Sequence, residues 1–222
     1  RQHCTPFDVQ VLTPMKKGEL GVHRCNEVLQ RYLNPEAPGK NQMELHGVLF
    51  REGDKVMQMK NNYQIKWEIR GYNHMMIEEG SGVFNGDCGI ITEIDTFNKE
   101  VTVRFDDEKY VTYPQGNLDE LELAYAITIH KSMGSEYETV IIPMLMAHRI
   151  LLTKNLIYTA VTRAKKRVIL VGQKRALFLA IHSGRKVKRN TCLAERILKY
   201  NQVFRQKALP QGATEQKLKK AG

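Results

Sequence analysis

The chain changes its secondary-structure pattern twice, and this restricts the folds available to it. Towards both ends, strands alternate with helices. Strands are predicted at residues 8–12, 55–59, 124–128, 139–143 and 167–171, and helices at 22–32, 154–164 and 173–182. In between, short strands follow one another with only turns to separate them, at 89–94, 100–105, 110–113 and 120–123. This pattern predicts an α/β fold with a parallel sheet, interrupted once by a small all-β barrel.

These patterns divide the chain into four predicted segments. The first part of the α/β domain takes residues 1–70, and its second part takes residues 124–184. The barrel insert lies between them, at residues 71–123. A basic C-terminal tail takes residues 185–222. Within the first segment, the prolines and glycines of residues 33–47 predict a loop.

Charge is distributed unevenly over these segments, although the whole chain carries +10 in 222 residues. Residues 71–123 hold 12 acidic and 3 basic side chains, whereas residues 185–222 hold 2 acidic and 11 basic ones. A cationic region favours a polyanionic partner such as nucleic acid, although a solvated basic face is the commoner meaning of such a run. The acidic insert is not expected to bind phosphate broadly.

Several classes of protein do not fit the composition. Hydrophobic residues make up 42% and charged residues 26%, which excludes a wholly disordered or fibrous chain. No apolar run approaches the ~20 residues of a membrane span, and the N-terminus has no apolar signal-peptide core. The four cysteines form no C-x-x-C pair, so we expect a reduced cytoplasmic protein without disulfides or a metal site. Because the first residue is not Met, we expect a part of a longer chain or a processed one.

One polar turn combines residue types that bind nucleotides or phosphate backbones. The sequence Thr128-Ile-His-Lys-Ser-Met-Gly-Ser-Glu136 follows a predicted strand, so its polar side chains meet at a sheet edge. Gly134 lets the backbone approach a ligand, and hydroxyls, free N–H groups and a lysine suit phosphate. The Glu136 carboxylate can accept two hydrogen bonds from a sugar. On this chemistry alone, an ordinary βα turn with a glycine explains the segment equally well.

A second polar segment ends in a basic residue. Thr153 can cap the predicted helix, and Leu156, Thr159 or Ala160, and Arg163 lie on successive turns of one helix face. The charge of Arg163 is favoured near the C-terminal end of the helix. Its guanidinium can reach an anion across an interface, as an arginine finger does. Taken alone, a solvated basic helix end is the simpler interpretation.

Two more segments place basic or amide side chains just beyond a predicted strand. Residues 11–22 contain the basic turn Lys16-Lys17-Gly18, and residues 53–63 end in Asn61-Asn62-Tyr63. Ligands of open α/β sheets bind beyond strand ends, which makes both segments candidates for ligand contact.

Together and in this order, the four segments resemble the second motor domain of superfamily 1 helicases, in particular the RecD-like branch. The turn at 128–136 is similar to the family's motif V, and Tyr158-Thr-Ala-Val-Thr-Arg-Ala-Lys-Lys166 is similar to motif VI. Further similarity lies in Gly53-Asp-Lys-Val-Met-Gln58, in Phe84-Asn-Gly-Asp-Cys-Gly89 and in Arg189-Asn-Thr-Cys-Leu193. The resemblance extends over nearly the whole chain.

The resemblance implies both a fold and a set of residue roles. The fold is a RecA-like parallel sheet of the P-loop NTPase type, without the phosphate loop, and with a small SH3-like barrel insert. Arg163 is implied to reach the γ-phosphate of ATP, while Gly134, Glu136 and Lys17 are further candidate nucleotide contacts. Single-stranded DNA is implied to contact Thr128, His130, Lys131, Ser132, Ser135, Asn61, Asn62 and Tyr63. Tyr63 could stack on a base, and a core tyrosine is an equal alternative.

Two residues depart from the family pattern, and one motif does not occur. Met133 stands where the family usually has Gln, and Lys17 stands where it commonly has Arg. Lysine keeps the charge but lacks the bidentate fork, so these changes concern coupling and not the fold. No G-x-x-x-x-G-K-[ST] phosphate loop occurs in the sequence. We therefore expect the C-terminal part of a larger bacterial, cytoplasmic helicase of DNA repair or recombination. Its N-terminal motor domain would bind most of the ATP and Mg²⁺.

The function implied by the resemblance is ATP-dependent DNA unwinding with 5′-to-3′ movement. The chain by itself is expected to be inactive because it lacks the phosphate loop. The alternative is a free-standing nucleic-acid-binding module without ATPase activity. The basic tail and the barrel support this alternative. A plain basic structural domain would require both helicase motifs to be chance matches. The sequence identifies no nuclease or repair partner.

Overall fold

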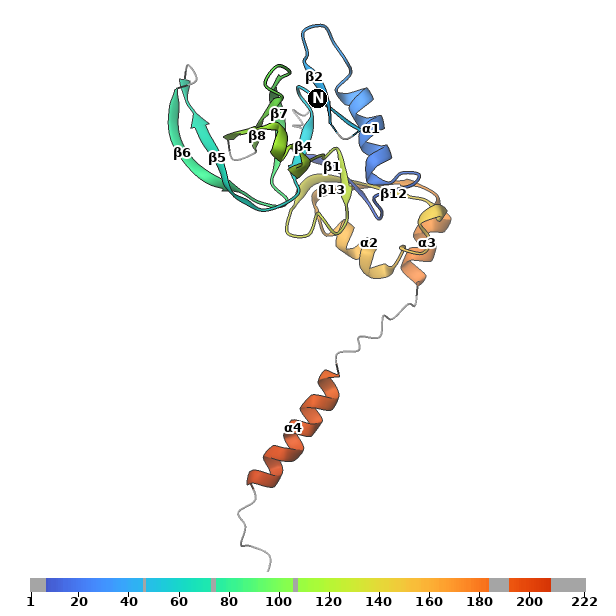
Figure 1. Ribbon diagram of the computed structural model, residues 1–222. Coiled ribbons are helices and arrows are strands. Elements are labelled where there is room, and N and C mark those ends of the chain that lie inside the picture. Colours follow the sequence, from blue (N-terminus) through green and yellow to red (C-terminus); the bar gives the residue numbers. More distant parts are fainter. Residues whose placement is uncertain (1–6, 46, 73–74, 106–107, 184–191, 209–222) are drawn as a thin grey trace, which may run out of the picture. The chain divides into compact units, whose positions relative to one another are not determined.

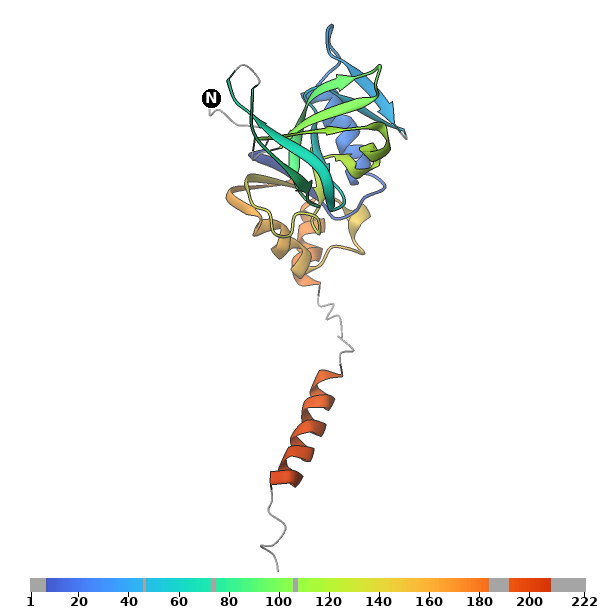
Figure 2. The ribbon, with the colours of Figure 1, turned by 60° about the vertical axis from the view of Figure 1, so that its left-hand side comes forward.

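The computed structural model describes residues 7–45, 47–72, 75–105, 108–183 and 192–208. The chain divides into two units, residues 1–183 and residues 184–222. The first unit holds a parallel sheet with helices and an antiparallel region, which Figures 1 and 2 show from two directions.

The parallel sheet is built from segments that lie far apart in the sequence. Its four strands are ordered β11-β1-β12-β13. They are β1 (Val9–Thr13), β11 (Ala126–Thr128), β12 (Tyr137–Met144) and β13 (Ala164–Gly172). Pairing aligns Val11 with Ala126 on one side and with Ile141 on the other. Because β1 and β11 lie side by side although the barrel separates them in sequence, the prediction of a sheet interrupted once is confirmed.

Helices cover both faces of this sheet: α1 (Val22–Leu33) lies on one face, and α2 (Lys154–Val161) and α3 (Lys174–His182) lie on the other (Figure 1). Thr153 caps α2 as predicted, since its hydroxyl accepts a hydrogen bond of 3.2 Å from the Leu156 amide. Strand residues such as Val140 and Ile142 are buried in one core with helix alanines, among them Ala160, Ala176 and Ala180. The small alanine side chains allow α2 and α3 to pack closely on the sheet.

β13 is the edge strand of the parallel sheet and is more exposed than its sequence predicts. Its run from Val168 to Val171 is apolar, which is typical of a strand buried on both faces. In the structure these four side chains are between 36% and 54% exposed. An edge position explains the difference, because β13 has only one neighbouring strand, β12.

The antiparallel region is a seven-stranded sheet with the order β10-β4-β7-β8-β9-β5-β6. The strands are β4 (Lys55–Gln58), β5 (Asn62–Arg70), β6 (Met76–Val83), β7 (Cys88–Asp95), β8 (Glu100–Phe105), β9 (Lys109–Tyr113) and β10 (Leu121–Leu123). A short 3₁₀ helix, η2 (Gln115–Glu120), precedes β10. Residues of β7 and β8 are buried in a second core: Val101, Val103 and Phe105 alternate along β8, and a register shift after Ile91 makes Ile94 the next buried residue of β7. This alternation is typical of a sheet with one buried face.

Two hairpins escape the sequence prediction. The first pairs β2 (Gln42–Leu45), which lies within the loop predicted at residues 33–47, with β3 (Val48–Arg51), for which no strand was predicted. The second joins β5 to β6 and extends away from the parallel sheet as an arm (Figures 1 and 2). Its β6 strand has few apolar residues and two internal glycines, so it lacks the usual strand pattern.

The barrel region also begins earlier than the predicted boundary at residue 71. β4 pairs with β7 and β10, and β5 pairs with β9, so residues 55–70 belong to the antiparallel sheet and not to the parallel one. Their partners lie up to 67 residues away in sequence, as in the pairing of Val56 with Leu123, and no local pattern reveals such pairing. The remaining barrel strands agree with the predicted ones to within one residue.

Buried hydrogen bonds join the barrel to the α/β region, and we call this set the buried joint. Asp54, which is 0% exposed, accepts hydrogen bonds from Gln30 and Asn34 of the α1 region at 2.6 and 2.7 Å. It also accepts from the Tyr125 hydroxyl at 2.9 Å. Asn26 of α1 donates to the Leu123 carbonyl at 2.6 Å and accepts from the Ala126 amide at 2.7 Å.

A second part of the buried joint comes from β1. The Gln10 side chain donates to the carbonyl oxygens of Ala124 and Tyr125 at 3.0 and 3.1 Å. Burial beside the Asp54 carboxylate raises the pKa of the Tyr125 hydroxyl, so Tyr125 stays a neutral donor. The buried joint therefore satisfies the polar groups at the point where the chain leaves the barrel and re-enters the sheet.

The second unit contains one described helix, α4 (Leu193–Ala208). Its apolar side chains Leu193, Ile197, Leu198, Tyr200 and Phe204 are all exposed. The predicted closing segment at residues 189–193 lies mostly outside the described residues. Within the described part of the chain, no helix is both long enough and apolar enough to cross a membrane.

Candidate nucleotide and nucleic-acid interface

The turn between β11 and β12 is held rigid by its own hydrogen bonds. The Lys131 amide donates to the Thr128 hydroxyl at 3.2 Å and to the Thr128 carbonyl at 3.0 Å. Gly134 has a φ of +94°, a conformation that side chains other than glycine rarely adopt, and its Cβ position faces open space. The glycine therefore serves the path of the backbone, and it leaves room beside the turn.

Residues of this turn differ in accessibility, which the sequence could not show. His130 and Glu136 are exposed, Lys131 and Ser135 are half-buried, and Ser132 is 0% exposed. The Ser132 hydroxyl donates to the Ile129 carbonyl at 2.8 Å. Ser132 thus stabilises the turn from inside. It was predicted to contact nucleic acid, but its side chain is not accessible at the surface.

Arg163 lies directly beside the end of this turn. α2 ends at Val161, earlier than predicted, so Arg163 follows the helix instead of forming its last turn. Its Nη1 donates to the Ser135 carbonyl at 3.2 Å, and its own carbonyl accepts from the Tyr137 amide at 2.9 Å. Among the described residues, its buried Nε has no hydrogen-bond partner. The guanidinium is therefore fixed beside Ser135 and Glu136 with a donor to spare.

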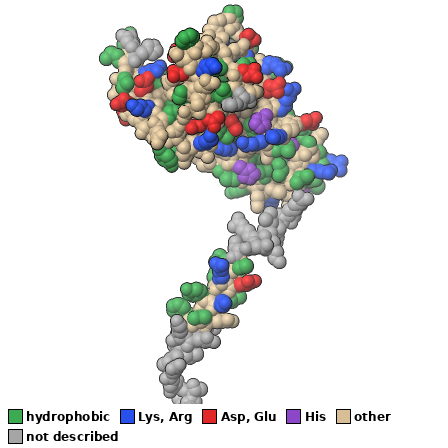
Figure 3. Space-filling view, viewed as in Figure 1, with side chains coloured by type: hydrophobic (Ala, Val, Ile, Leu, Met, Phe, Trp, Pro, Cys, Tyr) green, Lys and Arg blue, Asp and Glu red, His purple; other side chains and the backbone are tan. Residues whose placement is uncertain are grey.

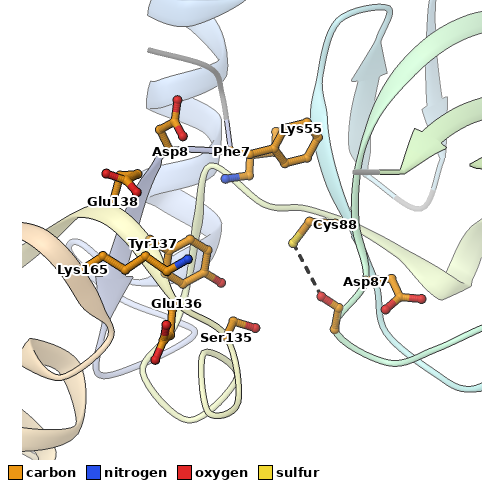
Figure 4. A pocket seen from close by; sticks show the side chains of 11 residues that line it. Phe7, Asp8, Lys55, Asp87, Cys88, Ser135, Glu136, Tyr137, Glu138 and Lys165 are labelled. Atoms are coloured by element: carbon orange, nitrogen blue, oxygen red, sulfur yellow. Dashed lines mark hydrogen bonds between the residues drawn. The ribbon is translucent and has the colours of Figure 1, made fainter. Parts of the chain in front are cut away.

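A polar cavity of about 440 Å³ opens next to this group, between the parallel sheet and the barrel. Figure 4 shows Ser135 and Glu136 on one side of it, and Asp87 and Cys88 of the barrel on the other. Lys165 also lines the cavity. Within the described residues, no group of three or more His, Cys, Asp or Glu side chains is placed to hold a metal ion.

Lys55 contributes a buried charge to the same cavity. Its side chain is 2% exposed, and its Nζ donates to the Gln10 side-chain oxygen at 2.9 Å. The ammonium also lies 5.8 Å from the ring centres of Phe7 and Tyr137 (Figure 4). Lys55 thus has a structural role, because it ties β4 to β1.

The other end of the turn contacts the barrel through a single hydrogen bond, which we call the exposed joint. Lys131 Nζ donates to the Asn85 side-chain oxygen at 2.6 Å. Partial burial lowers the pKa of the Lys131 ammonium, against a raising effect from Glu122. The Asn85 amide in turn donates to the Asn61 side chain at 2.9 Å, and Asn61 donates to the Tyr63 hydroxyl at 3.3 Å. The structure thereby brings Lys131, Asn61 and Tyr63 into one group.

Asn62 is not part of that group. Its side-chain nitrogen donates to both oxygens of Glu120, at 3.2 and 3.0 Å. Its side-chain oxygen accepts from the amides of Gln64 and Ile65, each at 3.1 Å. With both ends of its amide engaged inside the barrel, Asn62 has a structural role instead of the predicted nucleic-acid contact.

Lys17 lies apart from the other candidate nucleotide contacts. It follows the C-terminal end of β1, whereas Glu136 precedes the N-terminal end of the parallel strand β12. β12 has 8 residues, so its ends lie roughly 23 Å apart at ~3.3 Å per residue. Lys17 instead lines a groove beside α1, together with Val22, Arg24 and Leu123. The structure does not bring Lys17 and Glu136 into one site.

Sequence reasoning missed Asn85 and Phe84 as candidate site residues. Both belong to the segment that leads into β7, and Asn85 precedes a glycine with a φ of +107°. A polar residue beside such a glycine marks a tight turn, but nothing local shows which partner the turn meets.

On the face in Figure 3, Lys and Arg side chains form a band across the middle of the first unit, beside Asp and Glu side chains.

Comparison with known families gives two matches, one that contains most of the antiparallel sheet together with α1, and one that lies in the second part of the α/β region. Residues 25–105 match the SH3 domain of ATP-dependent RecD-like DNA helicases. Residues 123–171 match the UvrD-like helicase C-terminal domain. The first match starts well before residue 71, in agreement with the early start of the antiparallel sheet.

Individual relatives point to the same family. The chain is 37% identical over 192 residues to the ATP-dependent RecD2 DNA helicase of Deinococcus radiodurans, covering 86% of this chain and 24% of the relative. It is 30% identical over 188 residues to the RecBCD enzyme subunit RecD of Mycolicibacterium smegmatis, covering 85% and 29%. The chain thus spans about a quarter of the length of these relatives.

Among solved structures, the Pif1 helicase of Candida albicans resembles the chain with a TM-score of 0.48 and 14% identity, covering 90% of this chain and 50% of that one. This likeness is too loose to carry an argument. The two family matches and the two relatives agree with the motifs at 128–136 and 158–166, and with the parallel sheet that the barrel interrupts. The chain therefore belongs to the RecD-like superfamily 1 DNA helicases, and it has the RecA-like second motor domain and the SH3-like insert of that family.

Proposed function

We propose that this chain works as the second motor domain of an ATP-dependent DNA helicase, with Arg163 as its arginine finger. The observation that carries the proposal is the position of Arg163, whose guanidinium is held against the Ser135 carbonyl beside Glu136 while its buried Nε keeps a free donor. One relative is named as an ATP-dependent RecD2 DNA helicase and another as the RecBCD enzyme subunit RecD, and the first name supports the same activity class.

The residues at this site fit a nucleoside triphosphate that is held by another segment of the protein. ATP with Mg²⁺, when bound, supplies the phosphoryl group whose transfer to water drives the motor. A preorganised guanidinium stabilises charge that develops on that group. Glu136 is exposed next to it and can accept hydrogen bonds from a sugar. The absence of a phosphate loop from the sequence agrees with a nucleotide held mainly by a first motor domain.

We assign single-stranded DNA to the other end of the same turn. Lys131 and His130 offer positive or hydrogen-bonding groups there, and Thr128 lies at their base. Asn61 and Tyr63 extend this surface onto the barrel through Asn85. Movement along the strand would be 5′ to 3′, as the RecD-like resemblance implies.

The test is ATP hydrolysis by the full-length protein that contains this chain. Arg163→Ala is expected to lower DNA-stimulated turnover by ~10³ or more, on the scale of other arginine fingers. Arg163→Lys keeps the charge but loses the fork, and it should remain strongly impaired. Arg167→Ala, at an exposed arginine on β13, is the matched control and should leave turnover unchanged. Equal turnover of Arg163→Ala and wild type would remove the finger assignment.

One observation supports the alternative function, a nucleic-acid-binding module without ATPase activity. The phosphate loop is absent from these 222 residues, so the chain by itself should hydrolyse no ATP. A full-length protein that binds DNA but shows no DNA-stimulated hydrolysis would favour the module. Hydrolysis by the 222-residue chain alone would contradict both proposals in their present form.

A further inference from the structure

Two aromatic side chains form an exposed pair at the base of the β5–β6 arm. The rings of Tyr63 and Phe84 lie 5.8 Å apart between centroids at an interplanar angle of 73°, which is an edge-to-face contact. Tyr63 is 67% exposed and Phe84 is 47% exposed. Single exposed apolar residues are ordinary, but two adjoining rings that stay in water form a patch that invites a ligand.

Polar contacts hold the two rings in place. The Tyr63 hydroxyl accepts a hydrogen bond from Asn61 at 3.3 Å, and the Phe84 amide donates to the Asp87 carboxylate at 2.8 Å. Gly82 has a φ of +105°, and a Cβ there would approach the Phe84 ring at 3.5 Å and the Tyr63 backbone at 4.0 Å. The backbone that presents Phe84 thus depends on a glycine, and the pair is positioned before a ligand arrives.

The exposed joint connects this pair to a cation. Asn85 follows Phe84 directly, and its side-chain oxygen accepts from Lys131 at 2.6 Å. Its backbone amide donates to Asn61, which contacts Tyr63. A lysine, two amide side chains and two rings therefore form one continuous surface. Proteins that hold single strands combine a positive track for the backbone with rings on which bases stack.

The charge of the barrel decides how a strand would lie on this surface. Carboxylates lie close to this pair and disfavour a phosphate there: Asp87 accepts from the Phe84 amide, and Glu120 accepts from Asn62, the residue before Tyr63. Lys131 carries the opposite charge on the side of the parallel sheet. A single strand fits this distribution when its phosphates face Lys131 and its bases face the barrel. An acidic peptide would have no such division of charged and uncharged parts.

We propose that the Tyr63–Phe84 pair is a base-stacking step of the barrel for single-stranded DNA whose backbone contacts Lys131. The inference rests on the proposed DNA contact at the turn between β11 and β12, and it adds Phe84 to the residues that bind the strand. Phe97 offers a contrast, since it is 92% exposed in the turn between β7 and β8, at the far end of β7.

The test compares two oligonucleotides of equal length and charge, oligothymidylate and an abasic oligodeoxynucleotide, in binding to the 222-residue chain by fluorescence anisotropy. Phe84→Ala is expected to weaken oligothymidylate binding by about 5- to 150-fold, from ~1–3 kcal/mol per stacked base. Binding of the abasic strand should stay unchanged. Phe84→Trp keeps a ring and should bind oligothymidylate at least as tightly as wild type. Phe97→Ala, the matched control, should change neither affinity.

Three outcomes separate the stacking step from the proposed DNA contact. Equal losses of Phe84→Ala on both strands would show a structural effect and overturn stacking. Unchanged oligothymidylate binding by Phe84→Ala, with weaker binding of both strands by Lys131→Ala, would overturn stacking and leave the DNA contact standing. Binding of neither strand by the wild-type chain would overturn the DNA contact itself and stacking with it.

Discussion

The buried joint and the exposed joint both connect the barrel to the α/β region, and they differ in burial and in number of bonds. In the buried joint, fully buried side chains such as Asp54 and Gln10 accept or donate several hydrogen bonds each. In the exposed joint, Lys131 and Asn85 share one hydrogen bond at the surface. The first arrangement suits a permanent connection. The second suits a contact that a ligand can replace, because water already competes for it.

The largest expected effect breaks the buried joint. Asp54→Ala removes the acceptor for Gln30, Asn34 and Tyr125, and leaves buried donors unsatisfied. At ~1–3 kcal/mol for each such donor, the free energy of unfolding should fall by about 3 kcal/mol or more. Urea denaturation of the 222-residue chain measures it. Asp119→Asn, which breaks only an ion pair with Lys60 on the surface, serves as the control and should change little.

The second effect uses a thiol as a reporter of the buried joint. Cys25 is buried next to Asn26 in α1, and burial raises the pKa of its thiol, whereas Cys192 is exposed. Since only the accessible thiolate reacts, Cys25 should react with a maleimide slower than Cys192 by about a factor of 10 or more. Mass spectrometry of timed samples resolves the two sites. Reaction of Cys25 as fast as Cys192 would mean that the buried joint opens readily.

A smaller effect concerns the salt dependence of DNA binding at the exposed joint. If Lys131 exchanges Asn85 for a phosphate, Lys131→Gln should reduce the slope of log K against log salt by about 0.7 for single-stranded DNA. Lys60→Gln is the matched control, because Lys60 already pairs with Asp119 at 2.6 Å. Titrations at several salt concentrations give both slopes. Equal slopes for wild type and Lys131→Gln would contradict a phosphate contact there.

The smallest effect is on stability. Asn85→Ala removes the exposed joint but leaves the buried joint intact. Because Asn85 is at the surface, the free energy of unfolding should stay within about 0.5 kcal/mol of wild type. The same urea titration used for Asp54→Ala measures this difference. A loss as large as that of Asp54→Ala would erase the distinction between the two joints.

The sequence predicts those parts of the fold whose pattern is local. The strands around Val140 and Val103, the helix α1 and the Thr153 cap follow from periodicity and residue type. The arm strand β6 does not, because its glycines and glutamates have no strand pattern of their own. It forms through pairing with β5.

The candidate site divides in the same way. Motif spacing identifies the turn at 128–136 and Arg163, and the structure places their ends side by side. Motif spacing cannot tell which polar atoms are already engaged. Ser132 bonds within the turn, and Asn62 bonds to Glu120, 58 residues away. Hydrogen-bond partners so distant in sequence become visible only once the fold is known.

The link from β11 to β12 is short, and strands of one sheet anchor both of its ends. It starts beside Lys131 and ends beside Arg163, while its middle is stiffened by the Thr128 and Ser132 hydrogen bonds. A link of this kind has no slack to absorb a displacement. Under the proposed assignment, with a nucleotide at Arg163 and a DNA strand at Lys131, a displacement of one side chain would be passed to the other without any helix or strand having to unfold.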